Sequence, residues 1–304
     1  MRDDENMSFE EVTRYGWFLG EEPTILCGRH PSEPLVAMQV DPIEPPHERV
    51  AVWDTTTADL VWAPENALAL CWRGADEVVL LREQYSDDGR EGIDPSRRSP
   101  HGAYTYYLER HSWPPRNLLA VCPLRLCLPD ARPSAVTLSP GSDLAVVQWF
   151  SSDPPCEGIE LVALQPRSAY QLDNAGYRAA SNDTTRPVFS PDGRYLAIAS
   201  RRDIWWTQQP NAFYDVPSEG GQFTVGQLVL LDLQAAQASG HYRYHEIDLE
   251  ENVPAGWLCE DSQTGDEAEL SQPRFVGPID LAITLPISGE QHFHVPNWIG
   301  AHGS

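Results

Sequence analysis

The feature of this sequence that most constrains its fold is a short pattern centred on proline. The stretch RPVFSPDGRYLAIAS, residues 186–200, passes from strand-forming residues into a Pro-Asp-Gly turn and back into strand-forming residues. This order of residues predicts a tight β-hairpin. Because the same order recurs along the chain, a small antiparallel unit is expected to build most of the protein.

Each copy of the pattern consists of an apolar strand, a small residue, a proline, a short turn and a Leu-Ala pair. The first copy contains Pro191, and VWAPENALALCW, VTLSPGSDLAVVQW and RFVGPIDLAITLP repeat the pattern around Pro64, Pro140 and Pro278. A looser fifth copy contains Pro31. Apolar segments such as EVVLLRE and GQLVLLDL follow the copies, so each unit is predicted to form three or four short antiparallel strands.

A unit of this size cannot bury its apolar flank alone, so several units are predicted to pack around an axis as an all-β propeller. Five repeat units are visible, and the chain length allows six or seven blades. The last unit lacks an outer strand, and the segment EEVTRYGWFL near the N-terminus is placed to supply one and close the ring. Residues 1–10 are predicted to be a disordered acidic N-terminus, and residues 299–304 a flexible C-terminus. Residues 11–298 are predicted to form a single propeller domain with inserted loops at 86–102, 201–225 and 259–271.

One copy resembles a known family of repeats. PVFSPDGRYLAIAS is similar to the repeat of Tol-type and WD-like β-propellers, whose consensus carries Phe-Ser-Pro-Asp-Gly before Leu-Ala. VAVWDTTTADLV, with Trp53 and Asp54, resembles the dipeptide that closes a WD repeat. The other copies lack Asp-Gly, and no Gly-His dipeptide precedes the strands, so the Asp-His network of WD repeats is not supported. The resemblance implies the architecture and no family-specific function.

The negative charge of the chain limits the kinds of molecule that it is expected to bind. Its formal net charge is -24, which repels phosphate backbones and anionic membrane surfaces, so neither nucleic acid nor membrane is expected as a partner. All basic residues are arginine, which excludes Schiff-base and P-loop chemistry based on lysine. The absence of lysine has three possible causes, which are codon bias, selection against a modifiable amine and a halophilic origin. No apolar run is long enough to cross a bilayer and the start is acidic, so a soluble cytoplasmic protein is predicted.

Few residues are suited to binding a metal or cofactor. The six cysteines are expected to be reduced thiols, and the pair in CPLRLC has no second pair or nearby histidine to complete a zinc site. His292 and His294 share one face of a predicted strand and are weak metal candidates, although a surface pair explains their spacing equally well. No cofactor is predicted.

The segment 201–225 is the strongest candidate for partner binding. It is rich in aromatic residues, including Trp205, Trp206, Phe213 and Tyr214. Long loops in compact domains are usually functional or disordered, and disordered loops avoid aromatic residues. The rings are therefore expected either to anchor a partner or to cover a neighbouring blade.

An acidic segment is expected beside the aromatic one. Strand parity predicts that 151–158, 201–225 and 259–269 emerge at one end of the blades and 86–102 at the other. The acidic residues Asp261, Asp266, Glu267 and Glu269 would then form a charged rim that attracts a partner with basic residues.

Two functions remain open. The first is a non-catalytic scaffold that binds a protein or peptide, either alone or as a subunit of a larger bacterial complex. The alternative is a hydrolase or lyase with a carboxylate or histidine site at the propeller axis, for which Asp143, Asp192 and Asp280 near the predicted inner hairpins are faint candidates that turn chemistry also explains. No nucleophile elbow, phosphate-binding glycine loop or HExxH motif is present in the sequence.

Overall fold

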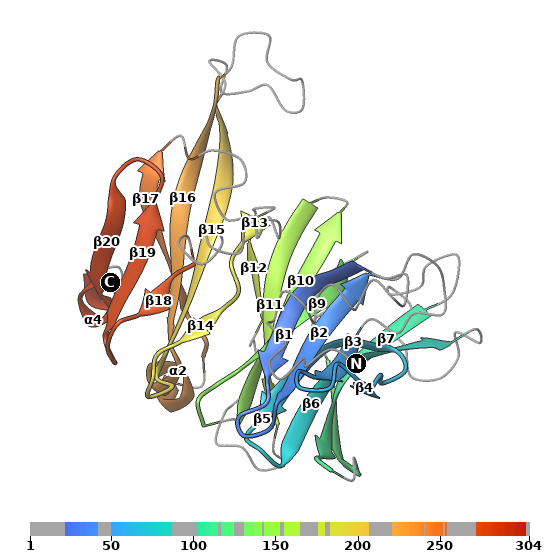
Figure 1. Cartoon of the computed structure of the whole chain (residues 1–304). Coiled ribbons are helices and arrows are strands. Elements are labelled where there is room, and N and C mark those ends of the chain that lie inside the picture. Colours follow the sequence, from blue (N-terminus) through green and yellow to red (C-terminus); the bar gives the residue numbers. More distant parts are fainter. Residues whose placement is uncertain are drawn as a thin grey trace. The chain divides into compact units, whose positions relative to one another are not determined.

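In the computed structural model the chain is mostly β, and its described strands form five antiparallel sheets (Figure 1). Contacts divide the chain into two compact units, Met1–Leu138 with Ser142–Ser151 and Glu160–Ser168, and Ser139–Gly141 with Ser152–Ile159 and Ala169–Ser304. The residues that the structure describes are 22–41, 50–86, 103–114, 117–124, 131–141, 143–152, 155–164, 176–179, 183–206, 221–239, 241–251, 253 and 272–301.

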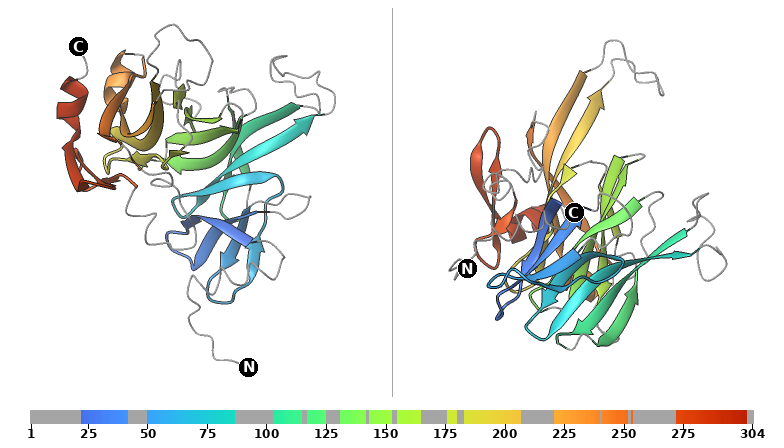
Figure 2. Two further views of the ribbon diagram at one scale, coloured as in Figure 1. Left: turned by 90° about the horizontal axis from the view of Figure 1, so that it is seen from above. Right: turned by 45° about the vertical axis from the view of Figure 1, so that its right-hand side comes forward.

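The first two sheets are four-stranded meanders in which the strand order follows the chain (Figures 1 and 2). The strands of the first sheet are β1 (Glu22–Arg29), β2 (Leu35–Asp41), β3 (Val50–Asp54) and β4 (Leu60–Trp62). Those of the second are β5 (Ala67–Arg73), β6 (Glu77–Ser86), β7 (Ala103–Ser112) and β8 (Leu118–Pro123). The third sheet has the same topology, with β9 (Ala131–Leu138), β10 (Leu144–Ser152), β11 (Pro155–Ala163) and β12 (Gly176–Ala179).

The fourth and fifth sheets lie in the second unit. The fourth contains β13 (Asp183–Thr184), β14 (Val188–Phe189), β15 (Tyr195–Trp206), β16 (Gly221–Asp232) and β17 (Tyr244–Glu251), and both β13 and β14 pair with β15. Helix α2 (Leu233–Ser239) connects β16 to β17. The fifth sheet contains β18 (Arg274–Phe275), β19 (Asp280–Leu285) and β20 (Gly289–His294), followed by helix α4 (Val295–Ala301). Residues 299–301 therefore belong to a helix rather than to the flexible terminus that we predicted.

Five described sheets match the five predicted repeat units, and four of the five marker prolines lie in hairpins. Pro31, Pro140, Pro191 and Pro278 fall between consecutive strands that pair with each other. Pro64 does not, because β4 pairs with β3 through Val52↔Trp62 and Trp53↔Leu60, whereas β5 begins the next sheet. The prediction of a hairpin at Pro64 was wrong, and this copy of the pattern links two sheets.

The position of Pro64 also changes the parity of the loop 86–102. Since β5 is the first strand of its sheet, the connection from β6 to β7 joins the second and third strands. The connections from β10 to β11 and, counting β13 and β14 as one position, from β15 to β16 do the same. We predicted that 86–102 emerges at the opposite end of the blades from 151–158 and 201–225. This prediction was wrong, because all three segments connect the second and third positions of their sheets.

The full Pro-Asp-Gly copy forms a turn held by its own side chains. The Ser190 hydroxyl donates to Asp192 Oδ1 over 2.6 Å and accepts from the Tyr195 amide over 2.9 Å. Gly193 has a φ of 73°, a conformation that L side chains rarely adopt. The hydrogen bond from Ser190 lowers the pKa of Asp192. The turn thus needs the serine, the aspartate and the glycine together.

The Leu-Ala pairs begin the strands after the turns and are buried. None of these eight residues is more than 5% exposed, namely Leu68, Ala69, Leu144, Ala145, Leu196, Ala197, Leu281 and Ala282. Strands that are buried on both faces carry continuous apolar runs instead of alternating ones. This burial explains why the apolar segments of the repeat lack polar residues at every second position.

Strand β6 shows directly that the second sheet is covered on both faces. Val78 and Leu80 pack into a core with residues of β2, β3 and β5, whereas Val79 and Leu81 pack into another core with residues of β7, β9 and β10. All four side chains are fully buried. Because successive residues of a strand point to opposite faces, the sheet lies between two apolar cores of the first unit.

Candidate functional site

The most distinctive feature of the second unit is a long hairpin formed by β15 and β16. The two strands pair continuously from Tyr195↔Asp232 to Trp206↔Gly221. The ladder between β17 and β16 ends at Val225, and the ladder between β13 and β15 ends at Arg201. Among the described strands, residues 202–206 and 221–224 therefore have only each other as ladder partners. We call these two segments the arm, which extends past the flanking strands in Figures 1 and 2.

The arm corrects the predicted boundaries of the aromatic insert. Residues 201–206 and 221–225 are strands rather than parts of a loop, because the residues in IWW and FTV favour extended backbone. Trp205 and Trp206 consequently lie on a paired strand. Phe213 and Tyr214 lie between the two strands, in a segment outside the described residues.

The register of the arm gathers apolar positions on a narrow ribbon. Ile204 pairs with Phe223 and Trp205 pairs with Gln222. By the alternation of a strand, positions 204, 206 and 223 share one face. A two-stranded ribbon is at best marginally stable in water, and its open edges can pair with another chain.

The remaining predicted binding residues are not placed by the structure. Asp261, Asp266, Glu267 and Glu269 lie outside the described residues, as do the other residues of 259–271. Their proximity to the arm stays a prediction.

The histidines of β20 bind carboxylates on the surface. His294 Nδ1 lies 2.9 Å from Asp280 Oδ1, and His292 Nε2 lies 3.0 Å from Glu290 Oε1. A hydrogen bond from Arg274 is the main cause that lowers the pKa of Glu290. Within the described ranges, no group of three or more His, Cys, Asp or Glu is placed to hold a metal ion.

The three carboxylates considered for catalysis each have a different partner. Asp143 lies 3.6 Å from an Arg73 nitrogen, Asp192 accepts from Ser190 within its own turn, and Asp280 contacts His294. The Asp192 contact lies within one turn, the Asp280 contact joins the paired strands β19 and β20, and the Asp143 contact joins the second and third sheets. These partners are those expected from a structural role.

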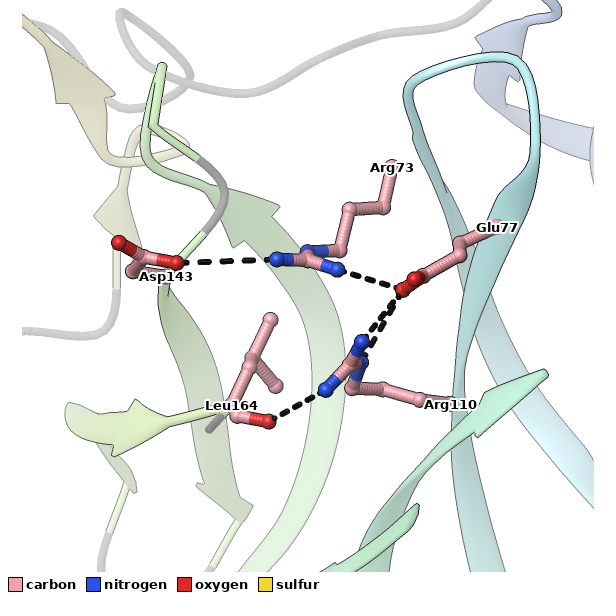
Figure 3. Close-up of polar contacts among 5 residues, drawn as sticks. All are labelled: Arg73, Glu77, Arg110, Asp143 and Leu164. Carbon is pink, nitrogen blue, oxygen red and sulfur yellow. Dashed lines mark hydrogen bonds and ion pairs between the residues drawn. The ribbon is translucent and has the colours of Figure 1, made fainter. Parts of the chain in front are cut away.

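Sequence analysis missed a cluster of ionic groups in the first unit, shown in Figure 3. Glu77 Oε2 accepts from Arg73 Nη1 over 2.5 Å and from Arg110 Nη2 over 2.7 Å. Arg110 Nη1 donates to the Leu164 carbonyl over 3.0 Å, and Arg73 Nη2 faces Asp143 Oδ1 at 3.6 Å. We call these groups the Arg–Glu cluster.

The Arg–Glu cluster connects strands of the second and third sheets. Arg73 ends β5, Glu77 begins β6 and Arg110 belongs to β7, whereas Asp143 and Leu164 lie beside β10 and β11. Burial by itself raises the pKa of Glu77, but hydrogen bonds from Arg110 and Arg73 outweigh it, and the pKa lies below its usual value. The only sequence signal of this cluster was the spacing of Arg73 and Glu77 around a tight turn. No local pattern indicated that Arg110 would join them.

The described helices include none that is long and apolar enough to cross a membrane. No protein family model matches the sequence. No curated protein sequence matches it significantly.

Several solved structures are similar to the chain. Hydrazine synthase of Kuenenia stuttgartiensis matches with 10% identity and a TM-score of 0.49, over 90% of this chain and 65% of that chain. The dihydro-heme d1 dehydrogenase NirN in complex with DHE matches with 16% identity and a TM-score of 0.33, over 88% and 56%. A Dos1 propeller matches with 10% identity and a TM-score of 0.29, over 85% and 74%. The chain thus spans less than two thirds of the hydrazine synthase and NirN chains.

Proposed function

We propose that this chain is a non-catalytic scaffold that binds a protein or peptide through the arm. The observation that carries the proposal is the continuation of the β15–β16 ladder beyond the last pairs made by β13 and β17. Apolar and aromatic residues on such a ribbon gain stability when a partner covers them or pairs with their edges. A partner surface would supply that cover.

Two groups of residues would share the binding. Trp205 and Trp206 on the arm, with Phe213 and Tyr214 in the segment that follows, would act as apolar anchors, since Trp and Tyr are enriched among interface hot spots. The acidic rim of Asp261, Asp266, Glu267 and Glu269 would attract a partner that carries basic residues. The net charge of -24 would speed the association with such a partner.

Replacing both arm tryptophans tests the proposal. The Trp205→Ala/Trp206→Ala variant is expected to bind its partner at least about 30-fold more weakly, because the loss of one hot-spot aromatic that contributes about 2 kcal/mol already weakens binding by that factor. Partners are first captured by the native protein from its source cells and identified by mass spectrometry. The purified partner is then titrated against both proteins by calorimetry.

The control is Ile287→Ala, which truncates an apolar side chain that is 72% exposed in the turn between β19 and β20. Both proteins are expected to keep the melting temperature of the native chain. Unchanged affinity in the tryptophan variant would contradict the proposal. A large drop in the melting temperature of the tryptophan variant would instead indicate that Trp205 and Trp206 pack in the hydrophobic core.

We infer also that the five sheets are blades of a propeller closed by the two ends of the chain. Two features support this inference: the second sheet is covered on both faces, and the described part of the fifth sheet has three strands with β20 at its edge. A strand from EEVTRYGWFL added to β20 would complete a four-stranded blade.

Deleting residues 1–20 is therefore expected to lower the melting temperature by several degrees, because β20 would lose a strand partner. Differential scanning calorimetry measures the change. Deleting residues 1–8 alone is the matched control, since it spares EEVTRYGWFL and should leave the transition in place. Equal melting temperatures for the two deletions would contradict the closure.

A further inference from the structure

His30 forms a buried junction between the first and second sheets. It follows β1 directly, in the turn that leads to β2, and it is 6% exposed. Its Nε2 lies 3.1 Å from the carbonyl oxygen of Ala75, in the turn between β5 and β6. Its ring packs against Trp72 of β5 in a T-shaped arrangement, with the ring centroids 4.6 Å apart. This one side chain therefore joins a turn of the first sheet to a turn of the second.

Backbone groups determine which ring nitrogen of His30 carries the hydrogen. The amides of Ser32 and Glu33 lie 3.3 and 2.9 Å from Nδ1, and because an amide N–H only donates, Nδ1 must be bare and accept from both. The Ala75 carbonyl only accepts, so Nε2 must carry a hydrogen and donate it. The ring is thus neutral, in its Nε2–H form, and both of its nitrogens are engaged.

Protonation would remove the acceptor that the turn between β1 and β2 uses. A hydrogen on Nδ1 would face the amide hydrogens of Ser32 and Glu33, so both hydrogen bonds would be lost. The buried ring would also carry a charge, which is unfavourable away from water unless the charge is paired. Both penalties are relieved if the turn moves away from the Ala75 carbonyl and exposes the ring to water.

The charged groups around this junction have other contacts. The charged and titratable residues beside it in the surrounding elements are Arg29, Glu33, Arg73, Asp76 and His111. Glu33 Oε2 lies 3.4 Å from Trp113 Nε1, and Arg73 and His111 contact glutamates of β6 and β7. In the described part of the chain, the ring nitrogens of His30 form hydrogen bonds with backbone groups only. A second N–H on the ring would therefore lack an acceptor.

We propose that His30 is an acid-sensitive latch between the first two sheets. The neutral ring holds the turn between β1 and β2 against the turn between β5 and β6. Protonation of the ring releases the first of these turns and opens the contact between the sheets at this end, and deprotonation restores it. The latch lies in the first unit and the arm in the second, so a fall in pH acts on the latch without involving the arm.

Measurements on the native chain test the latch directly. Long-range proton–nitrogen NMR spectra of the histidine rings are recorded from pH 8 to pH 5, the range in which histidine usually changes its charge. The His30 ring is expected in the Nε2–H form at pH 8 and as imidazolium in a substantial part of the molecules at pH 5. In step with this change, the hydrogen-exchange protection of the Ser32 and Glu33 amides, corrected for the intrinsic effect of pH, should fall at least about tenfold.

The variant His30→Asn separates titration from structure. The side-chain oxygen of asparagine accepts from amides two and three residues ahead, as Nδ1 does, but it does not titrate. The variant should melt at a lower temperature than the native chain at pH 8, because the bond to Ala75 is lost. Between pH 8 and pH 5, however, its melting temperature should fall by several degrees less. His292→Asn is the matched control, since the His292 side chain is 59% exposed, and it should follow the native chain.

Three results would overturn the proposal. They are a His30 ring that stays neutral at pH 5, a protonated ring with unchanged protection of the Ser32 and Glu33 amides, and equal pH dependence of the melting temperature in the native chain and His30→Asn. The first two are measured on the native chain, so they decide the question even if the variant does not fold. Effects of acid on the carboxylates are common to all three proteins and cancel in the comparison.

Discussion

Substituting alanine for either Leu80 or Leu81 is expected to lower the free energy of unfolding by about 3 kcal/mol. Both side chains are fully buried, and they belong to separate apolar cores on the two faces of the second sheet. Each truncation removes buried methyl groups and leaves a cavity that neighbouring side chains fill incompletely. Chemical denaturation with urea, followed by tryptophan fluorescence, measures both values.

Comparing the two leucines tests the packing of this sheet. In a sheet with one face in water, one of two successive residues would be exposed, and its truncation would cost less than about 1 kcal/mol. Leu119→Ala provides the matched control, because this leucine lies in the same sheet and is 49% exposed. A small effect at either Leu80 or Leu81 would contradict the enclosure of the sheet between two cores.

Glu77→Gln is expected to lower the free energy of unfolding by about 2 kcal/mol at neutral pH. The substitution leaves the guanidinium groups of Arg73 and Arg110, whose side chains are 14% and 12% exposed, without their shared carboxylate. The loss of unfolding free energy would be larger if Glu77 were fully buried. Its side chain is 24% exposed, so water screens part of its interaction with the two arginines. Urea denaturation at several pH values measures the difference.

The pH dependence of this difference has a defined sign. The pKa of Glu77 in the folded protein lies below the usual glutamate value of 4.5, so the carboxylate stabilises the fold above about pH 4.5. This contribution is lost as the pH falls through the lowered pKa, and the native protein and Glu77→Gln should converge in stability there. The exposed carboxylate of Glu290 is the control, and Glu290→Gln should leave the stability nearly unchanged. A difference that persisted at low pH would contradict an ionic role for Glu77.

The hairpins and strands of this protein follow from local chemistry, and the sequence predicts them well. The Ser190, Asp192 and Gly193 turn is encoded within five residues, and the Leu-Ala pairs mark strands that are buried. Pro64 was misassigned because a proline between two apolar strands looks the same whether the strands pair with each other or with different neighbours. Ladder partners depend on residues far along the chain, which a local pattern does not contain.

The candidate sites were predicted less completely for the same reason. The aromatic composition of 201–225 marked the segment, but the pairing of Ile204 with Phe223 across the segment gives the arm its shape. The Arg–Glu cluster joins Glu77 to Arg110, which is remote in sequence and adjacent on β7. The exposure of β8 depends on its place at the edge of a sheet, which the apolar sequence LLAV alone would have assigned to the core.

The enclosure of β6 has a consequence for the motions of the first unit. A central strand with an apolar core on each face, and with ladder partners on both edges, reaches water only when one of those cores opens. The amide hydrogens of its buried residues, 78–81, are therefore expected to exchange with solvent only through the largest unfolding event of the unit. The three sheets that contribute to these cores are thereby coupled into one cooperative block, while fluctuations of low energy are confined to the outer strands.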